Sequence, residues 1–130
     1  MISLFKVPHI MRCNRHESGV FRDTGFDCVY CGKVVVAGPH LKIFEFKDDI
    51  ATASPVLVIP FTNVQSIEKS LFRSGGGRYK GGQVRIVGRF DREVNGIVLE
   101  EMVTFQMPLD AVYHDFVETL EHAMSVFGNN

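Results

Sequence analysis

Residues 83–107 read QVRIVGRFDREVNGIVLEEMVTFQM and carry the clearest structural signal in the chain. At their centre, Asn95-Gly96 favours a type I′ turn, because both residue types tolerate positive φ angles. Before this turn, apolar and basic residues alternate as in a strand with one buried face: Val84, Ile86 and Phe90 alternate with Arg85 and Arg89. The stretch therefore predicts a β-hairpin within an antiparallel sheet.

The second half of the stretch, Ile97–Met107, is the expected return strand. Its apolar residues are expected to face the core: Ile97, Leu99, Val103, Phe105 and Met107. Glu100 and Glu101 interrupt the alternation, so the sequence predicts a β-bulge there.

A helix is expected after Pro108, where apolar residues recur at three- and four-residue steps. These residues are Leu109, Val112, Phe116, Leu120, Ala123 and Phe127. Asp110 favours the positive end of a helix, and Gly128 favours its termination. We therefore expect one amphipathic helix of about 17 residues at the C-terminus.

The region before the hairpin predicts further strands separated by turn residues. The expected strands are Lys33–Ala37, Leu41–Lys47, Val56–Phe61 and Asn63–Arg73, followed by a glycine-rich loop over Ser74–Gly82. Together with the hairpin and the helix, they predict a mainly β (α+β) fold.

The length and composition are those of one globular domain with a small appendage. The chain has 130 residues, of which 45% are hydrophobic and 22% charged. The longest apolar stretch, Pro55–Phe61, is too short to cross a bilayer, and the N-terminus lacks the features of a signal peptide. Three cysteines do not make a secreted disulfide framework. A soluble, cytoplasmic protein is expected.

Two close pairs of candidate metal ligands lie near the start of the chain. Cys13 and His16 form the first pair, and Cys28 and Cys31 form the second. Two residues between ligands allow a tight turn to aim both side chains at one ion, so we expect a structural zinc site. His9 is an alternative to His16. The cysteines would otherwise be ordinary thiols, or Cys28 and Cys31 a redox pair.

These ligands assign residues 1–32 to a zinc-ribbon-like segment and residues 33–130 to the β domain. Short strands over Val20–Phe21 and Phe26–Tyr30 would join the two ligand pairs as a small hairpin.

The charges are divided along the chain. Residues 69–92 hold seven basic residues and one acid, whereas residues 93–121 hold seven acids and no lysine or arginine. The basic stretch makes five residues candidates for binding an anionic partner: Arg73, Arg78, Lys80, Arg85 and Arg89. The alternative is a solvated strand face, since charge runs are usually exposed surface.

The order of these elements resembles the pleckstrin-homology-like (PH-like) superfold, and the GRAM and bacterial PH-like families in particular. Gly38–Phe46 is similar to the "G-x-L-x-x-F" strand pair of these families, and Ile59–Lys69 to their "I-P-hydrophobic-x-x-I-x-x-I-x-K" segment. Phe105, Pro108 and the following DAVYHDFVETL are similar to the "F-x-F … f-x-x-L" ending. The resemblance implies a β-barrel or curled antiparallel sheet with one C-terminal helix. Such domains mostly bind lipids, peptides or proteins and rarely catalyse.

The sequence therefore predicts a non-enzymatic binding or adaptor module with a structural zinc ion. Its expected partner is another protein or a second copy of the chain. The alternative is nucleic-acid or anionic-lipid binding through the Lys69–Arg92 stretch. His114 and His122 have no serine or cysteine partner identifiable in sequence, so we expect them to be surface residues rather than parts of a nucleophilic triad.

Overall fold

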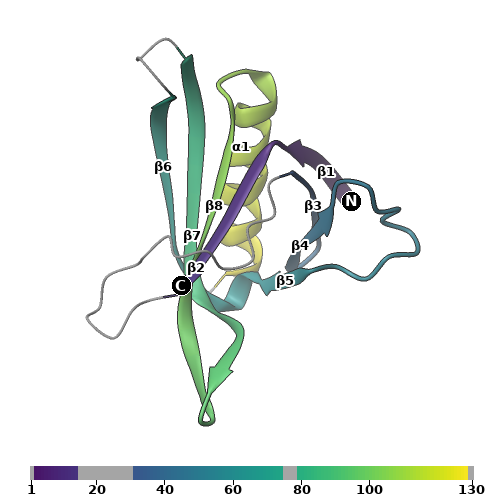
Figure 1. The fold of residues 1–130 in the computed structure, drawn as a ribbon, viewed down its shortest axis with the longest axis vertical. Helices are drawn as coiled ribbons and strands as arrows, with labels where there is room; N and C mark the ends of the chain where they lie inside the picture. Colours follow the sequence, from purple (N-terminus) through teal and green to yellow (C-terminus); the bar gives the residue numbers. More distant parts are fainter. Residues whose placement is uncertain (1, 15–30, 75–78, 129–130) are drawn as a thin grey trace.

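The computed structural model describes residues 2–14, 31–74 and 79–128 (Figure 1). In order, the elements of this part are β1 (Ile2–Val7), β2 (His9–Asn14), β3 (Gly32–Ala37), β4 (His40–Glu45), β5 (Leu57–Pro60), the 3-10 helix η1 (Phe61–Asn63), β6 (Val64–Ser74), β7 (Tyr79–Val94), β8 (Ile97–Pro108) and α1 (Ala111–Phe127).

The strands form two antiparallel four-stranded sheets. The first, called sheet A, has the order β1-β3-β4-β5, and the second, called sheet B, has the order β2-β8-β7-β6. The expectation of a mainly β chain with one C-terminal helix is confirmed. The barrel form of that expectation is wrong, because the strands of the described residues make two separate sheets rather than one closed cylinder.

The chain passes from one sheet to the other at Pro8. On one side of it β1 pairs with β3, with Val7 opposite Gly32; on the other side β2 pairs with β8, with His9 opposite Gln106. Proline has no N–H to donate to a sheet, which suits the point where the pairing partner changes. Residues 2–14 thus contribute one strand to each sheet, and neither strand was predicted from the sequence.

The predicted boundary at residue 32 coincides with the first residue of β3. The predicted strands Val20–Phe21 and Phe26–Tyr30 lie outside the described residues. The division of the chain into a zinc-ribbon-like segment and a β domain therefore stays a prediction.

Helix α1 packs on the core between the two sheets and contacts β1, β8 and η1 (Figure 1). Phe116 is fully buried, and its ring meets Phe5 of sheet A and Phe105 of sheet B edge-to-face, with ring centroids 5.1 and 5.3 Å apart. Edge-to-face geometry adds to the stabilisation that comes from burying the rings. One helical side chain therefore joins all three layers.

The limits of α1 follow from its end residues, as the sequence predicted. The Asp110 carboxylate accepts hydrogen bonds from the backbone N–H groups of Val112 and Tyr113, at 2.9 and 3.4 Å. This N-cap satisfies two donors that have no partner within the helix. At the other end, the Gly128 N–H donates to the Met124 carbonyl oxygen at 3.0 Å.

The β7–β8 hairpin turns at Asn95-Gly96, with φ angles of 51° and 80°, as a type I′ turn requires. The predicted bulge at Glu100-Glu101 is wrong. The register shifts on the other strand, between Arg89 and Glu93. Glu101 itself is fully buried and points toward the core side of sheet B.

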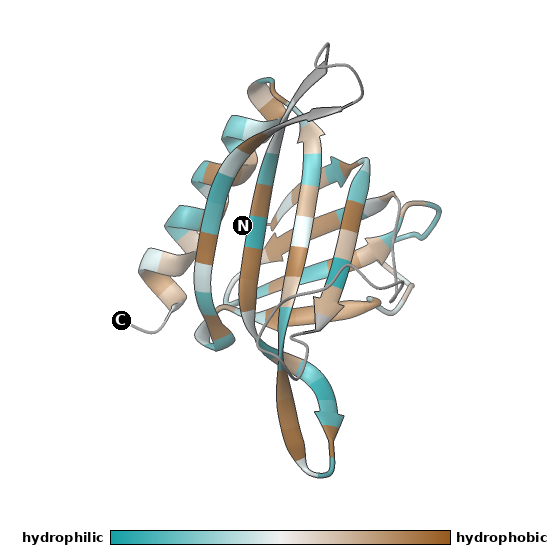
Figure 2. Cartoon of the chain, turned by 60° about the vertical axis from the view of Figure 1, so that its left-hand side comes forward, coloured by the Kyte–Doolittle hydropathy of each residue, from teal (hydrophilic) through white to brown (hydrophobic). Residues whose placement is uncertain are grey.

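Ile97 was expected to face the core, and this is also wrong, since 65% of it is exposed. The hairpin extends beyond the end of sheet A, so nothing in the described structure covers its far end (Figure 2).

Gly82 of β7 lies directly under the ring of Tyr113, and a Cβ atom at this position would overlap that ring. We expect Gly82→Ala to lower the free energy of unfolding by about 1–3 kcal/mol, because the buried ring cannot move without disturbing the core. Urea denaturation measures the change. In a Tyr113→Ala background the same substitution should have almost no effect. An equal loss in both backgrounds would show that the close approach to Tyr113 is not the cause.

Candidate functional site

A groove of about 470 Å³ crosses the face of sheet B that is turned away from the core. We call it the outer groove. Nine residues from all four strands line it: Met11 and Cys13 of β2, Met102, Thr104 and Gln106 of β8, Gln83, Arg85 and Val87 of β7, and Glu68 of β6.

The alternation of strand side chains places these residues on one face. Their sequence neighbours face the other way and are buried in the core, as Ile10, Val84 and Val103 illustrate. The sequence predicted the outward direction of Arg85 but not the groove. A strand pattern shows which side chains share a face, but it does not show how far that face curves.

Hydrogen-bonding groups cross the middle of the outer groove. The Gln106 amide donates to the Gln83 side-chain oxygen at 2.7 Å, and the Gln83 amide donates to the Ser70 hydroxyl at 3.2 Å. If the Gln83 amide is rotated, its oxygen accepts from Arg85 Nε at 3.1 Å instead. Gln83 is only 7% exposed and Thr104 only 4%. The floor of the outer groove is therefore polar, and hydrogen bonds hold its side chains in place.

Charged and apolar groups surround this polar floor. Glu68 and Arg85 lie opposite each other across β6 and β7, and both are exposed. The half-buried side chains of Met11, Met102 and Val87 supply the apolar surface. Methionine is unbranched and adapts its shape to different ligands. A groove with paired opposite charges, amides and thioethers suits an extended polypeptide, whose own backbone both donates and accepts hydrogen bonds.

Two of the four zinc ligands predicted from the sequence belong to the described residues, and they lie on different parts of the fold. Cys13 is buried on β2, opposite Met102 of β8, and Cys31 is exposed just before β3. His16 and Cys28 lie outside the described residues. Within residues 2–14, 31–74 and 79–128, no three His, Cys, Asp or Glu side chains gather as metal ligands would.

The strand registers do not bring Cys13 and Cys31 together. Gly32 is paired with Val7, so Cys31 lies near the corner at Pro8. From Pro8 the chain runs along β2 to Cys13, about 16 Å away at the usual rise of a strand. Zinc–sulfur bonds of about 2.3 Å require the sulfur atoms to be close neighbours. The register thus favours separate positions for these two cysteines, whereas His9 lies at the same corner as Cys31. The four-ligand zinc site stays a prediction.

Of the five predicted anion-binding residues, the structure describes the side chains of Arg85 and Arg89. Both are exposed on the outer face of β7, as expected. Arg89 donates to the Val98 carbonyl oxygen at 2.6 Å. Arg73 and Lys80 belong to strands, but their side chains are not described, and Arg78 lies outside the described residues.

The two ends of the basic stretch are paired with acids. Lys69 binds Glu121 of α1 at 2.7 Å, and this partner raises the pKa of Lys69. Arg92 lies 3.3 Å from the carboxylate of Glu101. The charges that are separated along the sequence are thus partly neutralised in the fold.

Sequence reasoning missed a partly buried ionic cluster at the base of the β7–β8 hairpin. The guanidinium of Arg12 binds both carboxylate oxygens of Glu101, at 2.5 and 2.9 Å, and also binds Asp91. Burial lowers the pKa of Arg12, but hydrogen bonds with Glu101 and Asp91 outweigh this effect and raise it. Because Arg12 and Glu101 are 89 residues apart, no local pattern could have revealed their contact.

No protein-family model matches the sequence, and no curated protein matches it. Within the described residues, no helix combines the length and the apolar surface needed to cross a bilayer.

Proposed function

We propose that this chain is a non-enzymatic binding module of PH-like architecture that binds an extended segment of a partner protein in the outer groove. The PH-like assignment is supported by the order of strands, by the two consecutive N-terminal strands that join one sheet each, and by a helix that follows the last strand. The observation that carries the binding proposal is the composition of the outer groove.

The lining of the outer groove favours binding over catalysis. It offers a carboxylate, a guanidinium, two amides, a hydroxyl, a thiol and two thioethers, and the lining residues described include no histidine. A cysteine nucleophile is normally activated by a neighbouring base or a helix N-terminus. Side-chain amides and paired opposite charges recognise a peptide backbone and its charged side chains.

A peptide library selected against the full chain tests this proposal. Selected peptides should bind wild-type protein, and Arg85→Glu should weaken their binding by about tenfold or more, because it places a second acid opposite Glu68. Lys42→Glu, a charge reversal on the outer face of sheet A, is the matched control and should leave binding unchanged. Fluorescence anisotropy provides the affinities.

Two results would count against the outer groove. Peptides that bind wild type and Arg85→Glu equally well would place the site elsewhere. Selection of peptides whose binding is lost in Lys42→Glu would place it on sheet A. Salt-dependent binding of DNA, RNA or anionic vesicles, with no peptide selected, would instead support the alternative partner class predicted from the basic stretch.

We also propose that the chain binds one zinc ion near Cys31, with Cys28 as its neighbouring ligand and without Cys13. Because Cys13 lies far along β2, Cys13→Ser should leave the zinc content unchanged, whereas Cys31→Ser should remove it. Elemental analysis of protein purified without chelator measures the ratio. Zinc that is absent from wild type, or is lost in Cys13→Ser, would contradict this assignment.

A further inference from the structure

The β7–β8 hairpin forms an arm that projects from the molecule beyond residue 90 (Figures 1 and 2). We call Asp91–Glu100 the arm. Val94 and Ile97 lie opposite each other near its turn and are 53% and 65% exposed. A two-stranded hairpin is barely stable by itself in water, and exposed apolar residues at its tip add no stability there. Apolar residues grouped at an uncovered tip are available for contact with a partner.

The ionic cluster fixes the arm where it leaves the body. Asp91 binds Arg12 of β2, and Arg92 lies 3.3 Å from the buried carboxylate of Glu101. These contacts set the direction of the arm relative to sheet B. A binding element that is already held in position loses less conformational entropy when it docks.

A second cavity lies beside the base of the arm and has a volume of about 680 Å³. It is lined by three apolar residues, by three uncharged polar residues and by one base: Val64, Phe90, Val98, Thr62, Asn63, Gln65 and Arg89. We call it the base pocket. It combines apolar and uncharged polar side chains with a single positive charge.

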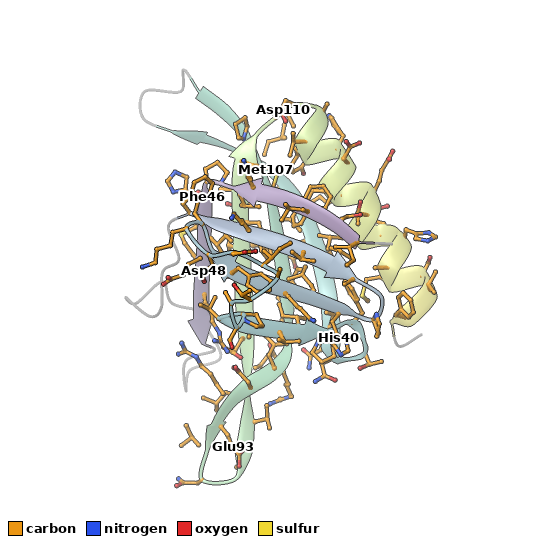
Figure 3. The ribbon with its side chains drawn as sticks, turned by 90° about the vertical axis from the view of Figure 1, so that its right-hand side faces the viewer. His40, Phe46, Asp48, Glu93, Met107 and Asp110 are labelled. Carbon is orange, nitrogen blue, oxygen red and sulfur yellow. The ribbon has the colours of Figure 1, made fainter. Side chains whose placement is uncertain are left out.

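The tip of the arm has the complementary composition. Glu93 adjoins Val94 and lies at the far end of the molecule from Asp110, the start of α1 (Figure 3). No salt bridge involves Glu93 in the described part of the chain, and Arg89 contacts a carbonyl oxygen rather than a carboxylate. Each copy of the chain therefore carries an apolar tip with an acid and a partly apolar pocket with a base.

We propose that two copies of the chain pair through their arms, with the tip of each arm seated in the base pocket of the other. A twofold axis makes two such arms antiparallel, so that each tip reaches the base of its partner and both pockets are filled. Val94 and Ile97 pack against Phe90 and Val98 of the second copy, and Glu93 faces its Arg89. The two arms are small beside the roughly 1,600 Å² of a standard interface, so the dimer is weak.

Sedimentation velocity of the full chain from micromolar to millimolar concentration tests this proposal. Wild type should dimerise reversibly, and Ile97→Asp should remain monomeric, because it places a charge in the apolar contact. The residue is exposed, so the variant should keep its fold, which circular dichroism verifies. Val126→Asp, on an exposed position of α1 (55%), is the matched control and should dimerise like wild type.

Exchanging the charges of Glu93 and Arg89 distinguishes this dimer from other modes of binding through the arm. Glu93→Arg and Arg89→Glu should each weaken dimerisation by about tenfold, and the double variant should recover most of the loss, because the two residues face each other only between copies. A wild type that stays monomeric, or single losses that simply add in the double variant, would overturn the proposal. The inference does not rest on the outer groove, since Arg85→Glu should leave dimerisation unchanged.

Discussion

Replacing Phe116 by alanine should lower the free energy of unfolding by about 3–5 kcal/mol, the usual range for a phenylalanine removed from a core. The loss should lie near the upper end, because the ring contacts both Phe5 and Phe105 and is fully buried. The cavity left by the substitution would lie where the helix packs against both sheets. Urea denaturation followed by circular dichroism measures the change.

Val126→Ala is the matched control for Phe116→Ala, since Val126 lies on the same helix but is 55% exposed. Its loss should be within about 0.5 kcal/mol, as for most surface substitutions. If Phe116→Ala costs no more than this control, α1 does not join the two sheets as described.

Glu101→Ala should lower the free energy of unfolding by about 3–5 kcal/mol, the range for removing one partner of a buried ion pair. The side chain of Arg12 is only 11% exposed, so without Glu101 it retains Asp91 but loses its buried partner. Arg92 loses the same carboxylate. Thermal and urea denaturation at neutral pH measure the effect.

The informative comparison for Glu101→Ala is the double variant Arg12→Met/Glu101→Met. Removing both charges avoids leaving one unpaired in the interior, so the double variant should be more stable than Glu101→Ala. Glu93→Ala, an acid at the exposed tip of the arm, should have little effect. A double variant less stable than Glu101→Ala would mean that the pair is strongly favourable in itself.

Local patterns predicted most of the fold, because the features they describe are local. Asp110 and Gly128 bound the helix, and Asn95-Gly96 makes the turn, since capping and turn geometry depend on neighbouring residues. The exposure of Ile97 was not predicted, because it depends on a feature that is not local. It depends on where the facing sheet ends, and the sequence of the β8 strand does not show where that is.

The N-terminal strands and the outer groove depended on contacts that are distant in sequence. Residues 9–14 pair with residues 101–106. The sequence of the short apolar N-terminus does not indicate which strand it pairs with. The close spacing of the cysteines and histidine suggested one ligand set. The fold instead places Cys13 along β2 and Cys31 at the Pro8 corner. Spacing in the chain does not show where the fold places each candidate ligand, and the four-ligand zinc site stays a prediction.

Carbon-13 NMR of methionine methyl groups, during titration with a peptide selected against the full chain, tests the binding proposal most directly. Met11 and Met102 line the outer groove, whereas Met124 packs against the core from the helix. We expect the Met11 and Met102 signals to shift with saturation while the Met124 signal stays in place. Shifts confined to Met124, with Met11 and Met102 unchanged under saturating peptide, would contradict it.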